Sequence, residues 1–154
     1  MVFKFIIKKS CFLLIFIIFS SITASFSQDF NADDIIGKWI PQQNRSIVEI
    51  FKIEDKYYAK IIWLKDIENI KGENILDIYN PNKKLRSRHV LNMIFMGDFE
   101  FKRGQWVNGK VYDPESGNTY MGNIKMQSDN ILELRGFIGI TLFGRTSVWH
   151  RVKT

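Results

Sequence analysis

The sequence predicts an all-β fold, an antiparallel up-and-down barrel of about eight strands. Past residue 35, short segments rich in β-branched and aromatic residues alternate with clusters of turn-forming residues. Most neighbouring segments are separated by connections short enough for hairpins. The same pattern is compatible with a two-sheet sandwich, but a closed barrel leaves no strand edge unpaired. The chain of 154 residues fits one domain.

The first 27 residues have the layout of a secretory signal peptide. Three lysines precede an apolar run over residues 11–19, and small residues, Ser25 and Ser27, come before Gln28. A membrane anchor would need about 20 apolar residues, and this segment is shorter. We therefore expect cleavage near Ser27/Gln28 and export to the periplasm or outside the cell, with no transmembrane anchor afterwards. Residues 28–35 would form a lead-in to a single domain over residues 36–154.

Removal of this segment changes the charge and the cysteine count. It holds three lysines, no acid and the single cysteine, so the formal net charge falls from +6 to +3 and no disulfide can form. The remaining surplus of positive charge is too small and too dispersed to indicate nucleic-acid binding. An exported chain of this kind depends on its hydrophobic core, and we expect a monomer.

The first three strands are predicted over residues 37–40, 46–53 and 56–64. Only Glu54 and Asp55 separate the second from the third, which indicates a tight hairpin. Alternation along the third strand places four side chains on one face: Tyr57, Ala59, Ile61 and Trp63.

Residues 65–89 interrupt the strand pattern. The segment is polar, contains the turn signal of residues 79–82, and ends in a basic run over residues 83–88. Connections this long are uncommon in compact domains and often carry function. The basic run could meet an anionic surface or could be solvated loop charge.

Five further strands are predicted over residues 90–101, 106–112, 119–126, 131–138 and 145–152. Residues 113–118 combine Asp, Pro and Gly in the order of a turn. A hairpin at Asn108-Gly109 would leave too short an arm, so a β-bulge is expected there.

Metal and catalytic signatures are weak. His89 and His150 lie far apart in sequence, and the acidic stretch 66–72 has its glycine one place late for a calcium loop. Ser116 lies in a turn, without a nucleophile elbow around it. The sequence therefore predicts no metal, no cofactor and no catalytic residue, and we expect a protein that is not an enzyme.

Residues 134–145 place two arginines around an apolar, glycine-containing turn. If Arg135 or Arg145 faced the interior of a barrel, it would require an acid, water or an anionic ligand group. Outward arginines beside a glycine-shaped hairpin are an equally good interpretation. The turn over residues 137–143 could form an exposed apolar patch or a lid on the barrel mouth.

Two resemblances to known families follow from particular residues. Gly37 and Trp39 on the first strand, with Arg151 on the last, resemble the signature of lipocalin-like (calycin) barrels. In that fold the indole closes one barrel end and the guanidinium packs over it, which implies a cation–π contact of about 0.5–2 kcal/mol. This resemblance assigns Gly37, Trp39 and Arg151 a structural role.

Residues 36–152 are similar to the bacterial secreted domain-of-unknown-function family numbered 2147. The family pattern leads us to expect glycine at position 92, after the paired arginines, and Asn92 departs from it. The family implies a lipocalin-like barrel in the cell envelope, without an assigned activity. The matching residues are Tyr58, Lys60, Ile61, Asp77, Asn80, Pro81, Arg86, Arg88, Trp106, 109–117, Tyr120, 134–139, 144–146, Trp149 and Arg151.

The leading hypothesis is non-catalytic binding of a small amphipathic or hydrophobic molecule inside the barrel. The candidate lining residues are Tyr58, Trp63, Tyr120, Arg135, Arg145 and Trp149. A second group would form a loop network at the rim, although a structural clasp of Asp–Arg pairs that holds the long loop is the favoured interpretation: Asp77, Asn80, Arg86 and Arg88. The alternative hypothesis is a cell-envelope interaction protein with a filled barrel, which docks through residues 65–89 or 137–143.

Overall fold

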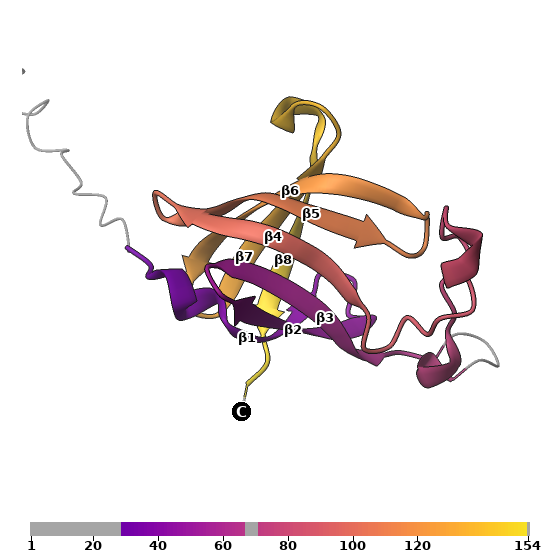
Figure 1. Cartoon of the computed structure of the whole chain (residues 1–154). Coiled ribbons are helices and arrows are strands. Elements are labelled where there is room, and N and C mark those ends of the chain that lie inside the picture. The colour runs from indigo at the N-terminus through magenta and orange to yellow at the C-terminus, as the bar shows by residue number, and fades with distance from the viewer. Residues whose placement is uncertain (1–28, 67–70, 154) are drawn as a thin grey trace, which may run out of the picture.

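The computed structural model describes residues 29–66 and 71–153 and shows a closed barrel of eight antiparallel strands (Figure 1). Each strand pairs with the next in sequence, and the eighth returns to the first. The predicted barrel is confirmed. The predicted signal peptide of residues 1–27 lies outside the described residues.

The strand bounds agree with the sequence prediction to within a few residues. Four short 3₁₀ helices lie in the connections: η1 (Ala32–Ile35), η2 (Gly72–Asn74), η3 (Lys83–Leu85) and η4 (Thr141–Phe143). No helix in the described residues is long and apolar enough to cross a membrane. The strands are β1 (Gly37–Pro41), β2 (Ser46–Ile53), β3 (Lys56–Leu64), β4 (Ile94–Lys102), β5 (Gln105–Asp113), β6 (Asn118–Ser128), β7 (Ile131–Phe137) and β8 (Arg145–Arg151).

The predicted start of the fourth strand at residue 90 is wrong, since β4 begins at Ile94. Asn92 has a φ of 64° and therefore cannot continue an extended strand. Asparagine is among the few residues other than glycine that tolerate this left-handed conformation. This explains how Asn92 can stand where the family resemblance leads us to expect glycine.

Two irregularities shape the strands around the barrel. The β2–β3 hairpin has the predicted two-residue turn, because Ile53 pairs with Lys56. Further along, Ile47 and Val48 pair with Trp63 and Ile61, so Ile62 is the extra residue of a bulge. The bulge turns Trp63 away from the face that Tyr57, Ala59 and Ile61 share, and 46% of Trp63 is exposed.

The predicted bulge at Asn108-Gly109 is confirmed. The pairing of β5 with β6 shifts register between Trp106 and Gly109, and Asn108 has a φ of 62°. The shift brings the backbone at Gly109 onto the ring of Phe99 in the core.

The segment before β1 closes one end of the barrel. Trp39 Nε1 donates a hydrogen bond to the carbonyl of Ile35 (2.9 Å), and Trp106 Nε1 donates one to the carbonyl of Ala32 (3.0 Å). Ile35 is completely buried between the strands. The segment expected as a lead-in is therefore a lid that the core indoles hold in place.

Arg151 completes this end, as the calycin resemblance implies. Its guanidinium carbon lies 4.1 Å from the centre of the Trp39 ring. Gly37 has a φ of 136°, and a side chain there would place its Cβ 2.8 Å from Arg151 Nη1. Only glycine meets both requirements.

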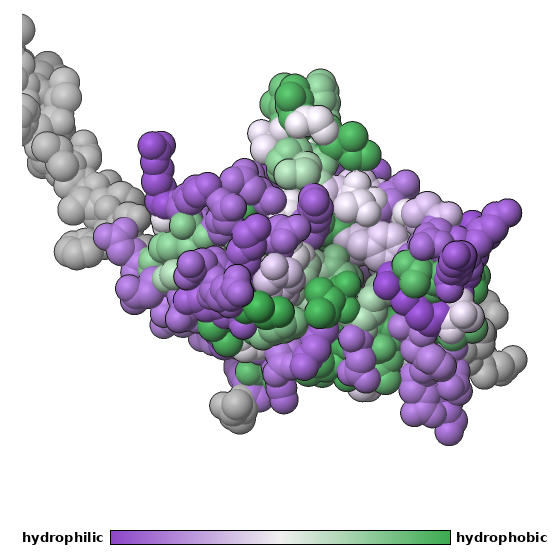
Figure 2. Space-filling model, viewed as in Figure 1, coloured by the Kyte–Doolittle hydropathy of each residue, from purple (hydrophilic) through white to green (hydrophobic). Residues whose placement is uncertain are grey.

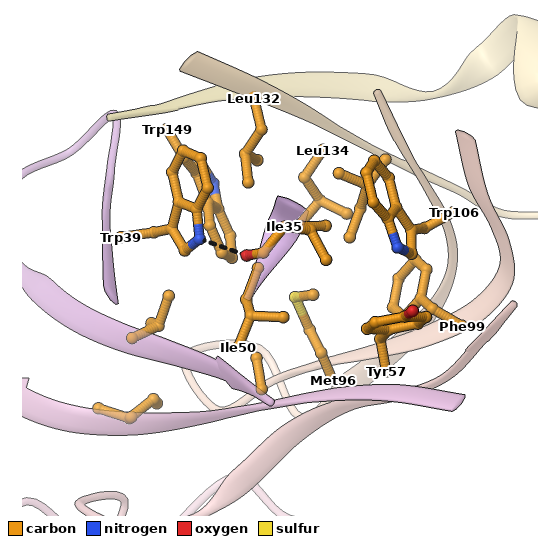
Figure 3. Packing of buried hydrophobic residues seen from close by; sticks show 14 of the residues in the cluster. Ile35, Trp39, Ile50, Tyr57, Met96, Phe99, Trp106, Leu132, Leu134 and Trp149 are labelled. Carbon is orange, nitrogen blue, oxygen red and sulfur yellow. Dashed lines mark hydrogen bonds between the residues drawn. The ribbon is translucent and has the colours of Figure 1, made fainter. Parts of the chain in front are cut away.

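Aromatic and aliphatic side chains together pack the barrel interior (Figure 3). Phe95 on β4 and Trp149 on β8 come from opposite sides of the barrel and stack with ring centroids 6.4 Å apart. Nearer the closed end, Tyr57 meets Trp106 edge to face at 6.2 Å. The interior is a packed core at both levels.

Substitution of Gly109 by Ala tests how tightly this core is packed. The added Cβ would lie 2.3 Å from the Phe99 ring, so we expect the free energy of unfolding in urea to fall by about 1–3 kcal/mol. In a Phe99→Leu background the same substitution should cost clearly less, because the smaller side chain leaves room. Gly136→Ala is the matched control, because its Cβ would lie 3.8 Å from the Tyr120 Cβ, an ordinary van der Waals distance. Equal losses in both backgrounds would contradict the packing.

Candidate functional site

The four longer connections of the barrel gather at one end, which we call the loop end. In an up-and-down barrel the connections that follow odd-numbered strands lie at the same end. They comprise residues 42–45, 65–93, 114–117 and 138–144. The opposite, closed end carries η1, the short turns and the C-terminal residues.

The two ends differ in charge. In the described residues, the loop-end connections hold seven Lys or Arg and four Asp or Glu. The lid, turns and C-terminal residues of the closed end hold two Lys or Arg and six Asp or Glu. The barrel is therefore electrically polar along its axis, with the loop end positive.

The long connection folds over the mouth of the barrel. Leu76 and His89 form an isolated bridge, and the Val90 amide donates to the Ile75 carbonyl (2.9 Å). Val90 and Met93 are buried and belong to the same cluster as the barrel interior. Residues 75–93 thus form a second lid, which we call the mouth lid.

A buried carboxylate holds the mouth lid together. Asp77 is completely buried and accepts from Asn80 Nδ2 (2.7 Å), from Arg88 Nε (2.9 Å) and Nη2 (2.8 Å), and from the Tyr112 hydroxyl (2.5 Å). Arg86 Nε donates to the carbonyl of Asn80 (2.8 Å). All four residues of the expected loop network therefore meet, and we call the group the Asp77 clasp.

Tyr112 is the member of the clasp that sequence reasoning missed. It comes from β5 and so ties the mouth lid to the barrel wall. Burial, reinforced by the hydrogen bond to Asp77, raises the pKa of Tyr112 to about 12. Nothing in the spacing of Tyr112 and Asp77 along the chain marks them as partners.

The β7–β8 connection projects from the barrel as an apolar knob, which we call the apolar tip (residues 138–143). Figure 1 shows it standing away from the other strands, and Figure 2 shows hydrophobic atoms gathered on it. Its four large apolar side chains are all more than half exposed: Ile138 70%, Ile140 58%, Leu142 75% and Phe143 78%. The apolar patch that the sequence left open is present.

Arg135 holds the apolar tip in shape. It lies on the outer face of β7 and donates from Nε (2.9 Å) and Nη2 (2.6 Å) to the Thr141 carbonyl, and from Nη2 to the Leu142 carbonyl (3.2 Å). Its Nη1 donates to Thr146 Oγ1 (3.0 Å) on β8. The guanidinium is thus used outside the barrel, not toward a ligand inside it.

The six candidate lining residues do not meet at one place. Trp149 is in the core, and Tyr120 shares a face of β6 with buried Ile124. Tyr58 lies on the outer face of β3, where it stacks on Phe51 at 6.1 Å. Arg145 is exposed at the start of β8.

Two hollows stand out on the described residues, and neither lies inside the barrel. One, of about 370 Å³, is lined by Trp63, Asp66, Lys71 and neighbouring residues at the loop end. The other, of about 280 Å³, lies at the closed end beside Asp34 and Arg151. Residues 29–66 and 71–153 contain no cluster of metal-ligating side chains.

Comparisons with known proteins agree with this architecture. A family model described as "Uncharacterized protein conserved in bacteria (DUF2147)" matches residues 37–151. The chain is similar to a solved structure of protein HP1028 from Helicobacter pylori, which is described as belonging to the lipocalin family. The two are 28% identical with a TM-score of 0.67, over 77% of this chain and 82% of that one. A search of curated proteins finds no match.

The raised pKa of Tyr112 predicts how stability responds to alkali. The hydroxyl ionises near pH 10 in the unfolded chain and near pH 12 in the folded one. The folded state therefore holds its proton longer, and its contribution to stability is lost as the pH rises through this window. We expect Tyr112→Phe to reduce the fall in unfolding free energy between pH 10 and 12, measured by urea titration.

Tyr57 sets the background of that experiment. Its pKa is also raised, mainly by burial and then by the hydrogen bond to Asp33, so part of the alkaline slope should persist in Tyr112→Phe. An unchanged slope would show that Tyr112 is not shielded by the clasp.

Proposed function

We propose that this chain, which belongs to the DUF2147 family of bacterial proteins, is an exported, non-enzymatic binding protein of the cell envelope that docks through its apolar tip. The observation that carries this proposal is the exposure of four large apolar side chains on one projecting turn. Soluble monomers rarely keep such a patch without a use for it. The signal-peptide pattern of residues 1–27 supports a periplasmic or extracellular location.

The state of the barrel interior supports docking over internal carriage. The Phe95–Trp149 stack crosses the barrel, and the mouth lid packs Val90 and Met93 onto the same core. Small barrels can be filled by their own side chains. We therefore place the binding surface on the outside of the protein and expect the protein to be a monomer.

The lipocalin-like fold also supports a non-catalytic role, because such a barrel is compatible with a protein that binds without turning a substrate over. The buried carboxylate of the loop end, Asp77, has partners for both of its oxygens. Asp77 therefore has a structural role, and we propose no reaction for its carboxylate.

Retention in the envelope tests the proposal. We expect the double variant Leu142→Ser, Phe143→Ser to be released from a cell-envelope fraction at least about tenfold more readily than the native chain, since two side chains lose their apolar contact area. The measurement is the fraction that remains with the envelope after a salt wash. Ile53→Ser is the matched control, because Ile53 is 49% exposed at the closed end. Equal retention of the native chain and the tip variant would refute docking through the tip.

A second candidate function is carriage of a small amphipathic molecule inside the barrel. Polar side chains of the Asp77 clasp hold residues 75–89 of the mouth lid to the barrel wall, so this part can move away from the wall while the backbone bonds of Asn92 and Met93 to Ile61 stay intact. The likeness to a protein described as a lipocalin supports the same idea. In this case the ligand would replace the lid side chains over the core.

The clasp variant Asp77→Asn tests this candidate. Loss of the charge-assisted bonds to Arg88 should raise the open population, and with it the apparent affinity for a fluorescent apolar probe, about tenfold. Asp98→Asn is the control, because Asp98 has a φ of 63° that asparagine tolerates. An unchanged probe affinity in Asp77→Asn would rule out carriage behind this lid.

A further inference from the structure

The apolar tip has the features of a segment that enters lipid. Residues 138–144 contain no charged side chain, and their only hydroxyl is that of Thr141. A protein pocket would have to be concave to receive a projecting knob, whereas a lipid surface is fluid and accommodates a convex one. The shape of the tip therefore favours a membrane over a protein partner.

The backbone of the tip is prepared for an apolar environment. Unsatisfied backbone groups are costly in lipid. The Thr141 and Leu142 carbonyls accept from Arg135, and the Phe143 and Gly144 amides donate to the Ile140 and Thr141 carbonyls (3.3 and 3.1 Å). The turn thus carries its own partners for these groups when water is withdrawn.

The loop end carries positive charge that has no partner within the described chain. Five cationic side chains there make no ion pair with a described residue: Lys65, Lys71, Lys83, Lys84 and Arg145. Two of the four acids of this end are already paired with arginines, because Asp77 is enclosed in the clasp and Glu115 pairs with Arg45 at 3.0 Å. An anionic lipid surface would match this charge, and each cation near such a surface strengthens binding about fivefold.

We propose that the apolar tip inserts into the interfacial layer of an anionic phospholipid membrane, while the unpaired cations of the loop end contact its headgroups. This inference rests on the proposed docking through the tip and names the partner. The acidic closed end would then face away from the membrane. Insertion of a few apolar side chains, together with basic side chains on the headgroups, gives reversible, peripheral binding.

Vesicle flotation tests the inference. The protein, purified without detergent, is mixed with vesicles of phosphatidylcholine alone or with phosphatidylglycerol in a three-to-one ratio. We expect binding to the mixed vesicles at least about tenfold stronger than to the neutral ones, and weakened by added salt. No binding to the mixed vesicles, or equal binding to both, would overturn the proposal.

Variants separate the two parts of the surface. The double variant Leu142→Ser, Phe143→Ser should lower vesicle binding at least about tenfold, and Arg145→Gln about fivefold. Ile53→Ser and Lys153→Gln, at the closed end, should bind as the native chain does. Loss in the closed-end variants, or none in the tip variant, would contradict the assignment. Circular dichroism establishes that each variant is folded.

A reporter in the tip gives a second, independent measurement. In Leu142→Trp the new indole should move into an apolar environment, so its emission should shift to the blue with mixed vesicles and not with neutral ones. An unshifted emission would overturn insertion of the tip.

The outcomes also distinguish this proposal from docking in general. Tip-dependent retention in envelope fractions together with no vesicle binding would overturn the lipid proposal, leave docking intact and point to a protein partner. Tip-dependent dimers in sedimentation velocity would overturn it in favour of a second copy of the chain. If neither envelope retention nor vesicle binding depends on the tip, both proposals are wrong.

Discussion

The rest of the barrel depends on the contacts that the guanidinium of Arg151 makes at the closed end. Besides facing the Trp39 ring, it donates to the carbonyls of Asp34 (2.6 Å), Ile36 (2.9 Å) and Asp129 (2.6 Å). These contacts join the last strand to the first strand, to the η1 lid and to the β6–β7 turn. Burial lowers the pKa of Arg151, but arginine keeps its charge at any physiological pH. A planar group with several donors suits this place, because a lysine ammonium could not face the ring and reach three carbonyls in these directions.

Closure at that end determines what the opposite end can do. With η1 and the indoles fixed, the interior is filled from the closed end up to the Phe95–Trp149 stack. The loop end is built differently, since the polar Asp77 clasp attaches the mouth lid to β5, and the last lid residues, Asn92 and Met93, exchange backbone hydrogen bonds with Ile61 of β3. A fully satisfied buried network fixes one arrangement of its members. The long connections, the apolar tip and the cations without an ion-pair partner thus belong to the loop end.

The sequence predicted the fold well because its determinants are local. Strand alternation, the Glu54-Asp55 hairpin, the Asn108-Gly109 bulge and the turn at residues 113–118 depend on neighbours in the chain. The site was harder to predict, because it depends on contacts between distant residues. Tyr112 joins Asp77 across 35 positions, and the bulge at Ile62 changes the side on which Trp63 lies. Four residues of the clasp were identified through a family resemblance, and only the folded chain shows which groups they form hydrogen bonds with.

The outward direction of Arg135 explains why the apolar tip stays exposed. Large apolar side chains on a flexible turn would fold back onto the barrel to escape water. The guanidinium prevents this because Nε and Nη2 donate to the Thr141 and Leu142 carbonyls. Its third nitrogen, Nη1, donates to Thr146 on the neighbouring strand. The same arginine that could have served a ligand inside the barrel therefore keeps a hydrophobic surface outside it. Exposure of the tip is a property of the fold, maintained by a specific set of hydrogen bonds, and this is what a surface for docking requires.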